Sequence, residues 1–171
     1  MRAKSRELGG GVNLARDPRN GRNFEYLGED PLLAGVLAGE AIRGAQSEKV
    51  VSTVKHFALN NQETHRSTLN AVIDEAAFRE SDLLAFEIAI ERGEPGSVMC
   101  AYNRVNGPWA CGSEFLLDKV LRDGNFENVW VQPAAGDAGQ ALPEPARDLA
   151  ARAHHGQGVE DLVVDQAGHV V

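Results

Sequence analysis

Three side chains that donate hydrogen bonds lie at or just beyond the ends of strand-like segments, namely Arg22, Lys55 and His56. Guanidinium, ammonium and imidazole groups suit a polyhydroxylated ligand, a carboxylate or a phosphate. Carboxylates occupy or flank the same loops at Asp17, Glu25, Glu29, Asp30 and Glu63. A structural alternative is that Arg22 pairs with Glu25 or Asp30 and merely holds its loop. For three donors at the ends of successive strands, we expect a binding site.

Several well-known nucleotide and hydrolase motifs are absent from the sequence. Gly9, Gly10 and Gly11 precede a predicted strand instead of linking a strand to a helix, so they do not form a phosphate-binding loop. The Gly-x-Ser-x-Gly turn that carries the serine nucleophile of α/β-hydrolases does not occur either. The donors must therefore act in another kind of site.

Metal and redox motifs are also weak. The two cysteines, Cys100 and Cys111, show no Cys-x-x-Cys or Cys/His metal spacing, and we expect two reduced or buried thiols. The alternative is a single bridge, if the protein is exported. His154 and His155 are adjacent but lack a third ligand at a suitable spacing. We therefore expect no metal and no organic cofactor.

The elements that must position the donors alternate between strands and helices. Apolar and β-branched runs predict strands over residues 11–15, 50–58 and 97–102, with a fourth candidate over 129–131. Between them, caps and helical spacing predict helices over residues 31–44, from Asp74 to about Arg92, and after Ser113. Such alternation indicates βα units and an α/β fold with a parallel sheet.

This arrangement gives the donors a common location. In barrels and open α/β sheets, ligands bind at the carboxyl ends of the strands. Lys55 and His56 close the second predicted strand, Tyr102 and Asn103 follow the third, and Arg22 follows the first. We expect these side chains to meet at one edge of the sheet.

Composition excludes several classes of protein. The net charge of −8 argues against a nucleic-acid partner that would require a basic face. No apolar stretch is long enough for a membrane span, and no signal peptide is recognisable, so we expect no membrane partner and, by default, a cytoplasmic location. A length of 171 residues is below the roughly 250 of a complete (β/α)8 barrel.

The last 39 residues differ from the rest. Residues 133–171 contain nine alanines, five glycines and three prolines, but no aromatic residue. We expect a poorly ordered tail or short helical segments, in which Leu149, Leu162, Val163 and Val164 are among the few candidates for a core.

Three motifs resemble those of family 3 glycoside hydrolases of the β-glucosidase type. They run from Gly11 to Pro31, from Val54 to Glu63 and from Val98 to Gly107, in the family's order and at plausible spacing. The resemblance covers residues 9 to about 123. It implies a partial TIM-like (β/α) barrel of about three to four βα units.

The resemblance also implies a function and its residues. Arg22, Lys55, His56, Met99 and Tyr102 would line the subsite for a terminal β-glucosyl residue of a β-glucoside or oligosaccharide substrate. Hydrolysis would be retaining and would use two carboxylates. From its sequence pattern alone, Met99 is equally explained as a core residue.

The sequence departs from the family where the nucleophile should lie. The family has Ser-Asp-Trp at the end of a strand, whereas this chain has Gln132, Pro133 and Ala134, and Asp137 is the nearest downstream carboxylate. The family's acid/base belongs to a later domain. We therefore expect a partial barrel domain over residues 1–132 and a divergent tail over 133–171, with a shifted reading frame as a hypothesis for residues 124–133.

Three functions follow from this comparison. The first is a β-glucosidase-type hydrolase in which Asp137 or a partner chain supplies the nucleophile. The second is a sugar-binding remnant without catalysis. The third is a truncated fragment that forms a homo-oligomer, because an incomplete barrel has open sheet edges.

Overall fold

A computed structural model describes residues 5–7, 11–122 and 162–164 of the chain. Its main sheet is parallel and has the strand order β1 (Ser5–Glu7), β2 (Val50–Phe57), β4 (Ser97–Cys100) and β6 (Leu162–Val164). A second, two-stranded sheet pairs β3 (Asn70–Ala71) with β5 (Arg104–Val105). The prediction of an α/β fold with parallel strands is thus confirmed.

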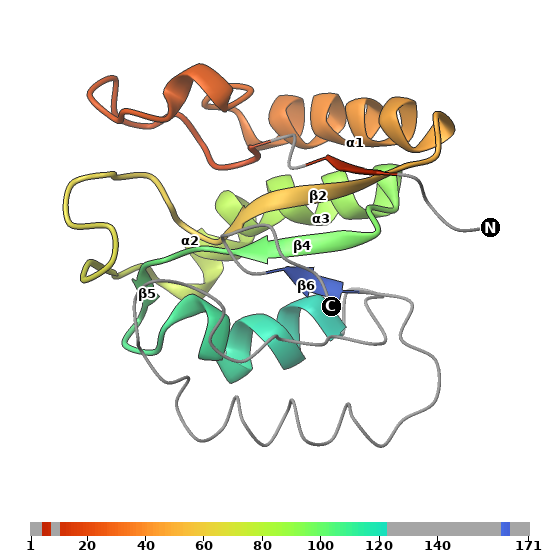
Figure 1. The fold of residues 1–171 in the computed structure, drawn as a ribbon. Helices are drawn as coiled ribbons and strands as arrows, with labels where there is room; N and C mark the ends of the chain where they lie inside the picture. The colour runs from red at the N-terminus through yellow and green to blue at the C-terminus, as the bar shows by residue number, and fades with distance from the viewer. Residues whose placement is uncertain (1–4, 8–10, 123–161, 165–171) are drawn as a thin grey trace.

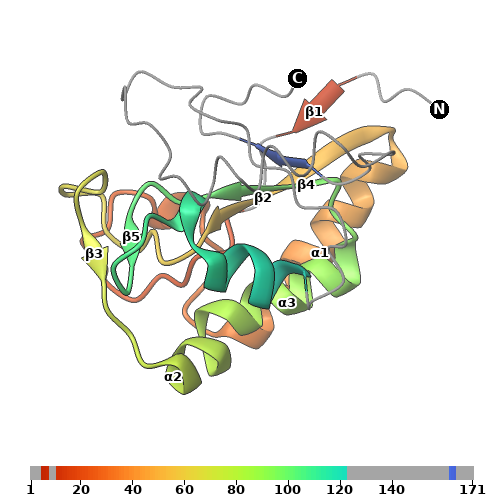
Figure 2. The same cartoon turned by 90° about the horizontal axis from the view of Figure 1, so that it is seen from below.

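The helices lie between these strands in the sequence. They are α1 (Pro31–Ser47), α2 (Glu75–Glu80), α3 (Asp82–Gly93) and the π-helix η3 (Phe115–Arg122), with short 3-10 turns η1 (Asn23–Glu25) and η2 (Ala110–Gly112). Figure 2 shows α1 and α3 side by side on one face of the main sheet. Within the described ranges, no helix has the length and apolar character needed to cross a membrane.

Helix α1 begins as predicted but ends later than predicted. The side chain of Asp30 accepts a hydrogen bond from the Leu33 amide at 2.7 Å, and Pro31 occupies the first turn. The helix continues past Gly44 to Ser47. One reason is Gln46, whose side-chain amide donates to the carbonyl oxygens of Gly93 and Glu94 at 3.1 and 2.9 Å and so ties the last turn of α1 to the end of α3.

Glycines let α1 and α3 approach closely. A Cβ atom at Gly39 would lie 2.6 Å from the Cβ of Arg92, and one at Gly35 would lie 2.7 Å from the Cβ of Ile88. Gly93 on α3 has a similar contact, because its Cβ would lie 2.9 Å from Ile42. The two backbones therefore pack together without intervening side chains at these positions.

The predicted single helix from Asp74 to Arg92 is wrong at Ser81. There the backbone is not helical (φ −124°, ψ −96°), and α2 and α3 are separate. The cause lies in Asp82, which is fully buried and pairs with Arg16 while accepting a hydrogen bond from Asn61 at 3.0 Å. A buried carboxylate needs such partners, and the break places it where two loops supply them.

Residues 11–15 do not form the predicted strand. Only Gly11 makes β-bridges, one to Tyr26 and one to Lys55. Beyond it, the amide of Val12 donates to the Lys55 carbonyl at 2.7 Å, and the Asn13 side chain makes two hydrogen bonds to the backbone of His56, at 2.8 and 2.9 Å. A buried asparagine side chain thus takes the place of the strand ladder beside the end of β2.

The third predicted strand is two residues shorter than expected. Strand β4 ends at Cys100, and the Ala101 amide still donates to the Phe57 carbonyl at 2.7 Å. The pairing of β2 with β4 shifts register between Lys55 and Phe57, where the Lys55–His56 and Phe57–Ala58 peptide bonds are cis.

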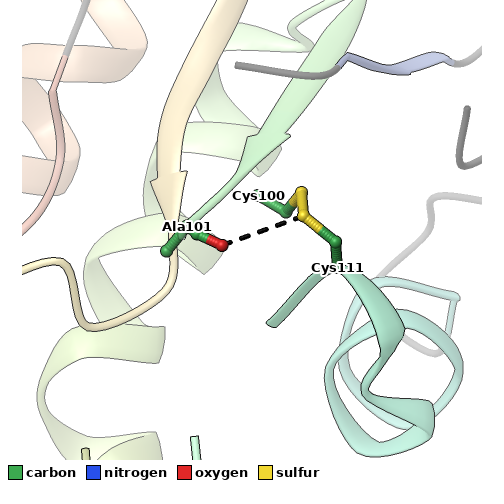
Figure 3. The surroundings of a disulfide bond; sticks show 3 residues. All are labelled: Cys100, Ala101 and Cys111. Carbon is green, nitrogen blue, oxygen red and sulfur yellow. Dashed lines mark hydrogen bonds between the residues drawn. A yellow bond between two sulfur atoms is a disulfide. The ribbon is translucent and has the colours of Figure 1, made fainter. Parts of the chain in front are cut away.

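The expectation of two reduced or buried thiols is also wrong, and the alternative of a single bridge is the one found. Cys100 and Cys111 form a disulfide, because η2 folds back and brings their Cα atoms to 5.3 Å from each other. Figure 3 shows this bridge between the end of β4 and η2, with the Cys111 sulfur 3.8 Å from the Ala101 carbonyl oxygen. The sequence separation of 11 residues gave no indication of this fold-back.

Two strands come from segments that the sequence pattern did not assign to the sheet. Ser5–Glu7 forms β1, and Leu162–Val164, from the tail expected to be poorly ordered, forms β6 beside β4. These three residues are among the few tail residues that the sequence offered as candidates for a core. The remainder of 133–171 and the candidate strand at 129–131 lie outside the described residues.

The core lies between the sheet and the helices. Phe57 at the end of β2 packs edge-on against Phe86 of α3, with ring centroids 5.1 Å from each other. Ser113 caps η3 as predicted, because its hydroxyl accepts from the Leu116 amide at 3.3 Å, and Leu116 and Leu117 are fully buried. This core fixes the strand ends that carry the predicted donors.

Candidate functional site

The predicted donors lie at the carboxyl ends of the strands. Figure 1 shows the loop before α1 and the loop after β2 together at the arrowhead ends of β2 and β4. Arg22 belongs to the first loop, directly before η1, and Lys55 and His56 belong to the end of β2. The spatial grouping expected from the sequence is therefore present.

Glu25 connects two of these donors. The Arg22 Nε atom donates to one of its carboxylate oxygens, and the Lys55 ammonium lies 3.1 Å from the other. All three side chains are largely buried, and that of Glu25 is 16% exposed. The pairing considered in the sequence for Arg22 thus exists with Glu25, whereas Asp30 caps α1 instead.

The two cations determine the charge of Glu25. Burial alone would raise the pKa of its carboxyl, but the hydrogen bonds from Arg22 and Lys55 outweigh burial and lower that pKa below its ordinary value. Glu25 is therefore ionised at neutral pH. A permanently ionised carboxylate can accept hydrogen bonds but cannot serve as a general acid.

The surroundings of Glu25 favour its ionised form, whereas those of His56 favour the uncharged form. Its side chain is buried, with 4% of the residue exposed, and burial lowers its pKa to about 3, with smaller contributions from the nearby charges of Arg22 and Lys55. The imidazole is thus neutral. Among the described residues, its buried Nδ1 atom has no hydrogen-bond partner, which is unusual for a buried polar group.

Tyr26 and Asn60 form the support beneath this group. The Tyr26 hydroxyl donates to the Asn60 carbonyl at 2.8 Å and accepts from the Asn60 side chain at 3.3 Å. Burial raises the pKa of the phenol, so it remains a donor. Gly11 lies against the ring, because a Cβ there would be 2.7 Å from a ring carbon of Tyr26.

A second charged group borders the first. Arg66 donates to Glu63 at 2.7 Å, and Asn60 donates to the other Glu63 oxygen at 3.4 Å. The Arg66 guanidinium lies 4.8 Å from the ring centroid of Tyr102. Glu63 was identified as a neighbouring carboxylate from the sequence, but Arg66 was missed, although its spacing of three residues from Glu63 is a recognisable signal for an ion pair.

The two other predicted subsite residues have different environments. Met99 lies in register with Lys55 on β4 and is 3% exposed, so it is packed in the core. Tyr102, just beyond β4, is 38% exposed and contacts Arg66. Asp137 lies outside the described residues. Contact of any of these residues with a sugar stays a prediction.

Metal clusters and cavities are two other features that bear on a site in the described residues. Within the part of the chain that the structure describes, no group of three or more histidine, cysteine or acidic side chains is arranged to hold a metal ion. A cavity of about 160 Å³ lies elsewhere, between α2, α3 and η3. Its lining includes Leu83, Phe86 and Leu121 but none of the predicted site residues.

Parallel strands alternating with helices, and polar side chains grouped at the strand ends, are typical of an α/β domain of barrel type. The glycosyl hydrolase family 3 N-terminal domain matches residues 9–136, and the chain therefore belongs to this family. The predicted family and the partial TIM-like barrel are both confirmed.

Individual relatives support this assignment. Thermostable beta-glucosidase B of Acetivibrio thermocellus is 46% identical over 116 residues, which are 68% of this chain and 15% of the relative. An exo-alpha-(1->6)-L-arabinopyranosidase of Bifidobacterium longum is 47% identical over 116 residues, which are also 68% of this chain and 15% of the relative. The solved structure of beta-glucosidase 3B from Thermotoga neapolitana in complex with glucose superimposes with a TM-score of 0.72 at 44% identity, over 78% of this chain and 19% of that one. This chain thus spans about 15% of the length of the curated relatives it matches.

Proposed function

We propose that the group formed by Arg22, Lys55 and His56 binds the terminal non-reducing β-D-glucosyl residue of a β-glucoside or oligosaccharide. The observation that supports this proposal most directly is the meeting of these three donors at the strand ends, with the buried Nδ1 atom of His56 left without a partner among the described residues. Relatives named as β-glucosidases point to the same substrate class.

The chemistry of the group suits sugar hydroxyls. Each hydroxyl both donates and accepts, and a neutral imidazole offers one donor and one acceptor nitrogen. The ammonium of Lys55 and the guanidinium of Arg22 add donors for neighbouring hydroxyls. In glycosidases, such hydrogen bonds strengthen as the oxocarbenium-like transition state forms.

Retaining hydrolysis by the whole protein is the second part of the proposal. This reaction needs a nucleophilic carboxylate and an acid/base about 5 to 5.5 Å away. Glu25 and Glu63 lie near the donors, but both are engaged in ion pairs. The reaction therefore requires other carboxylates, with Asp137 as the candidate nucleophile. Without them, the site binds a sugar and does not cleave it.

One experiment distinguishes these outcomes. The chain and its Lys55→Ala, Asp137→Ala and Lys119→Ala variants are assayed for nitrophenol release from a nitrophenyl β-D-glucoside and titrated with glucose by calorimetry. Removal of Lys55 should weaken binding by about tenfold to a hundredfold, as expected for a hydrogen bond to a charged group. Lys119 is exposed on η3, and its removal should change nothing.

Each result has a definite meaning. Nitrophenol release that disappears in Asp137→Ala supports a hydrolase, and release that persists in this variant shows that Asp137 is not the nucleophile. Glucose binding without release supports the sugar-binding alternative. A chain that binds no glucose contradicts the proposed function.

We also propose that the chain forms a homo-oligomer. Within the described ranges, β1 and β6 are the outer strands of the main sheet, and outer strands offer unpaired backbone groups to a second chain. Helix α1 adds exposed apolar side chains at Leu32, Leu33 and Leu37. Exposed apolar surface of this kind favours association.

A further inference from the structure

The position of Glu25 suggests a role that the proposed sugar contacts do not include. Its two carboxylate oxygens are divided between two cations, Arg22 and Lys55, which come from different segments of the chain. A surface ion pair of one cation and one anion would contribute little to stability. Here, one largely buried anion holds two largely buried donors, so its removal would affect both.

The backbone holds Glu25 in this place. Its amide donates to the Arg22 carbonyl at 3.1 Å within the η1 turn. The next residue, Tyr26, is buried and bridges Gly11, and Gly11 in turn bridges Lys55. Gly11 therefore lies between the backbone segment that carries Glu25 and the one that carries Lys55. The carboxylate is built into the fold at this point and is not a mobile surface group.

The local charge balance depends on Glu25. The group contains three cations, Arg22, Lys55 and Arg66, and two carboxylates, Glu25 and Glu63, while the nearby His56 is neutral. Glu63 pairs with Arg66, which leaves Glu25 as the counter-ion shared by Arg22 and Lys55. Without it, two cations would remain close together in a partly buried place, and they would repel each other and attract anions.

We propose that Glu25 is a positioning residue that holds Arg22 and Lys55 in place for sugar hydroxyls and makes the site selective for neutral over acidic sugars. This inference rests on the proposed function, because it assigns the charge preference of the same site. Glu25 acts through Arg22 and Lys55, and its negative charge determines the net positive charge around a bound sugar.

The test compares two ligands that differ only in the group at C6, which is neutral in one and negatively charged in the other. Methyl β-D-glucoside is neutral, and methyl β-D-glucuronide carries a carboxylate in place of its hydroxymethyl group. The chain and its Glu25→Gln, Glu25→Asp and Glu29→Gln variants are titrated with each ligand. Glu29 is exposed in the same segment, so Glu29→Gln makes the same change in net charge outside the ion-paired group. Circular dichroism verifies that each variant is folded.

Glu25→Gln should bind the glucoside about tenfold more weakly, and its ratio of glucuronide to glucoside affinity should rise about tenfold. Glu25→Asp should keep the wild-type preference for the glucoside, and Glu29→Gln should behave as wild type. If Glu25 had a purely structural role, its replacement would weaken the binding of both ligands equally and leave the ratio of their affinities unchanged.

Two results would overturn the inference, and they differ from each other. If the wild type binds the glucoside and Glu25→Gln keeps the same ratio of affinities, the inference is wrong and the proposed function stands. If the wild type binds neither ligand, the proposed function fails and the inference fails with it.

Discussion

Single side chains in this domain are placed by partners from distant segments. His56 is held by Asn13, Glu25 holds both Arg22 and Lys55, and Asp82 holds Arg16 and Asn61. Each of these groups joins residues that are far apart in the sequence. A change in one of them should therefore affect a neighbouring loop as well as its own.

The buried imidazole of His56 predicts that stability falls in mild acid. Its pKa is lowered to about 3 in the folded chain, against an ordinary value near 6.5 in the unfolded chain, so the unfolded state binds the extra proton between these values. The free energy of unfolding should therefore decrease as the pH falls from about 6.5 towards 3, by up to about 5 kcal/mol from this group. Urea denaturation at several pH values measures it.

A His56→Gln variant provides the control for this prediction. Glutamine does not titrate, so the variant should lose that part of the pH dependence and keep the part that other groups contribute. An identical pH profile for the wild type and the variant would contradict the prediction.

The sequence predicted the donors of the site but not their counter-ion. Arg22, Lys55 and His56 were recognisable because their types and their places after apolar runs are local properties. The ion pair between Glu25 and Lys55 was not recognisable in the sequence. It depends on the folded backbone, in which Gly11 lies between Tyr26 and Lys55. The Arg66 guanidinium contacts the ring of Tyr102, which is far from it in the sequence. Nothing in the sequence around either residue predicts this contact.

At the scale of elements, caps were predictable and interruptions were not. Asp30, Asp74 and Ser113 cap helices as their sequence signals indicated. The break at Ser81 was not signalled, because the apolar spacing continues through it and its cause is the buried Asp82. Periodicity describes one face of an element, whereas a buried charge requires partners from other elements.

The close packing of α1 on α3 predicts opposite effects for two alanine substitutions on one helix. Gly39→Ala should lower the free energy of unfolding by about 1 to 3 kcal/mol, because the new methyl group would lie 2.6 Å from the Cβ of Arg92. Gly44→Ala should raise it by up to about 1 kcal/mol, because nothing lies within 4 Å and alanine favours the helix. Urea denaturation of both variants measures the difference.

The comparison of the two variants excludes a general effect of alanine on α1. Since both substitutions add the same methyl group to the same helix, only the contact with α3 differs. Equal stabilisation by the two changes would show that the helices separate at little cost.

At the scale of the whole molecule, the parallel order of the strands was predictable but their full set was not. The apolar runs of β2 and β4 are nearly continuous, a pattern typical of parallel strands. Ser5–Glu7 and Leu162–Val164 are only three residues long, and their place in the sheet comes from pairing with β2 and β4. Segments this short carry too little pattern to be identified by themselves.

The proposed oligomer predicts that a charge on the exposed face of α1 weakens association. Leu32, 60% exposed, is replaced by glutamate, which should lower the mass observed in sedimentation equilibrium at a given concentration. Val72→Glu is the matched control, because Val72 is 80% exposed and lies outside α1. A wild-type chain that sediments as a monomer contradicts the proposed oligomer, and equal effects of the two changes contradict the part assigned to α1.

The parallel sheet also has a consequence for the time in which the domain forms. Its register places Ser5 beside Val50, Thr53 beside Ser97, and Ser97 beside Leu162, so no two of these neighbouring strands can pair through a short turn. Each pairing requires the closure of a long stretch of chain before its contacts can repay the lost entropy. During synthesis on a ribosome, β4 must wait until Leu162–Val164 have been made before β6 can join it, and its edge stays open to other chains until then.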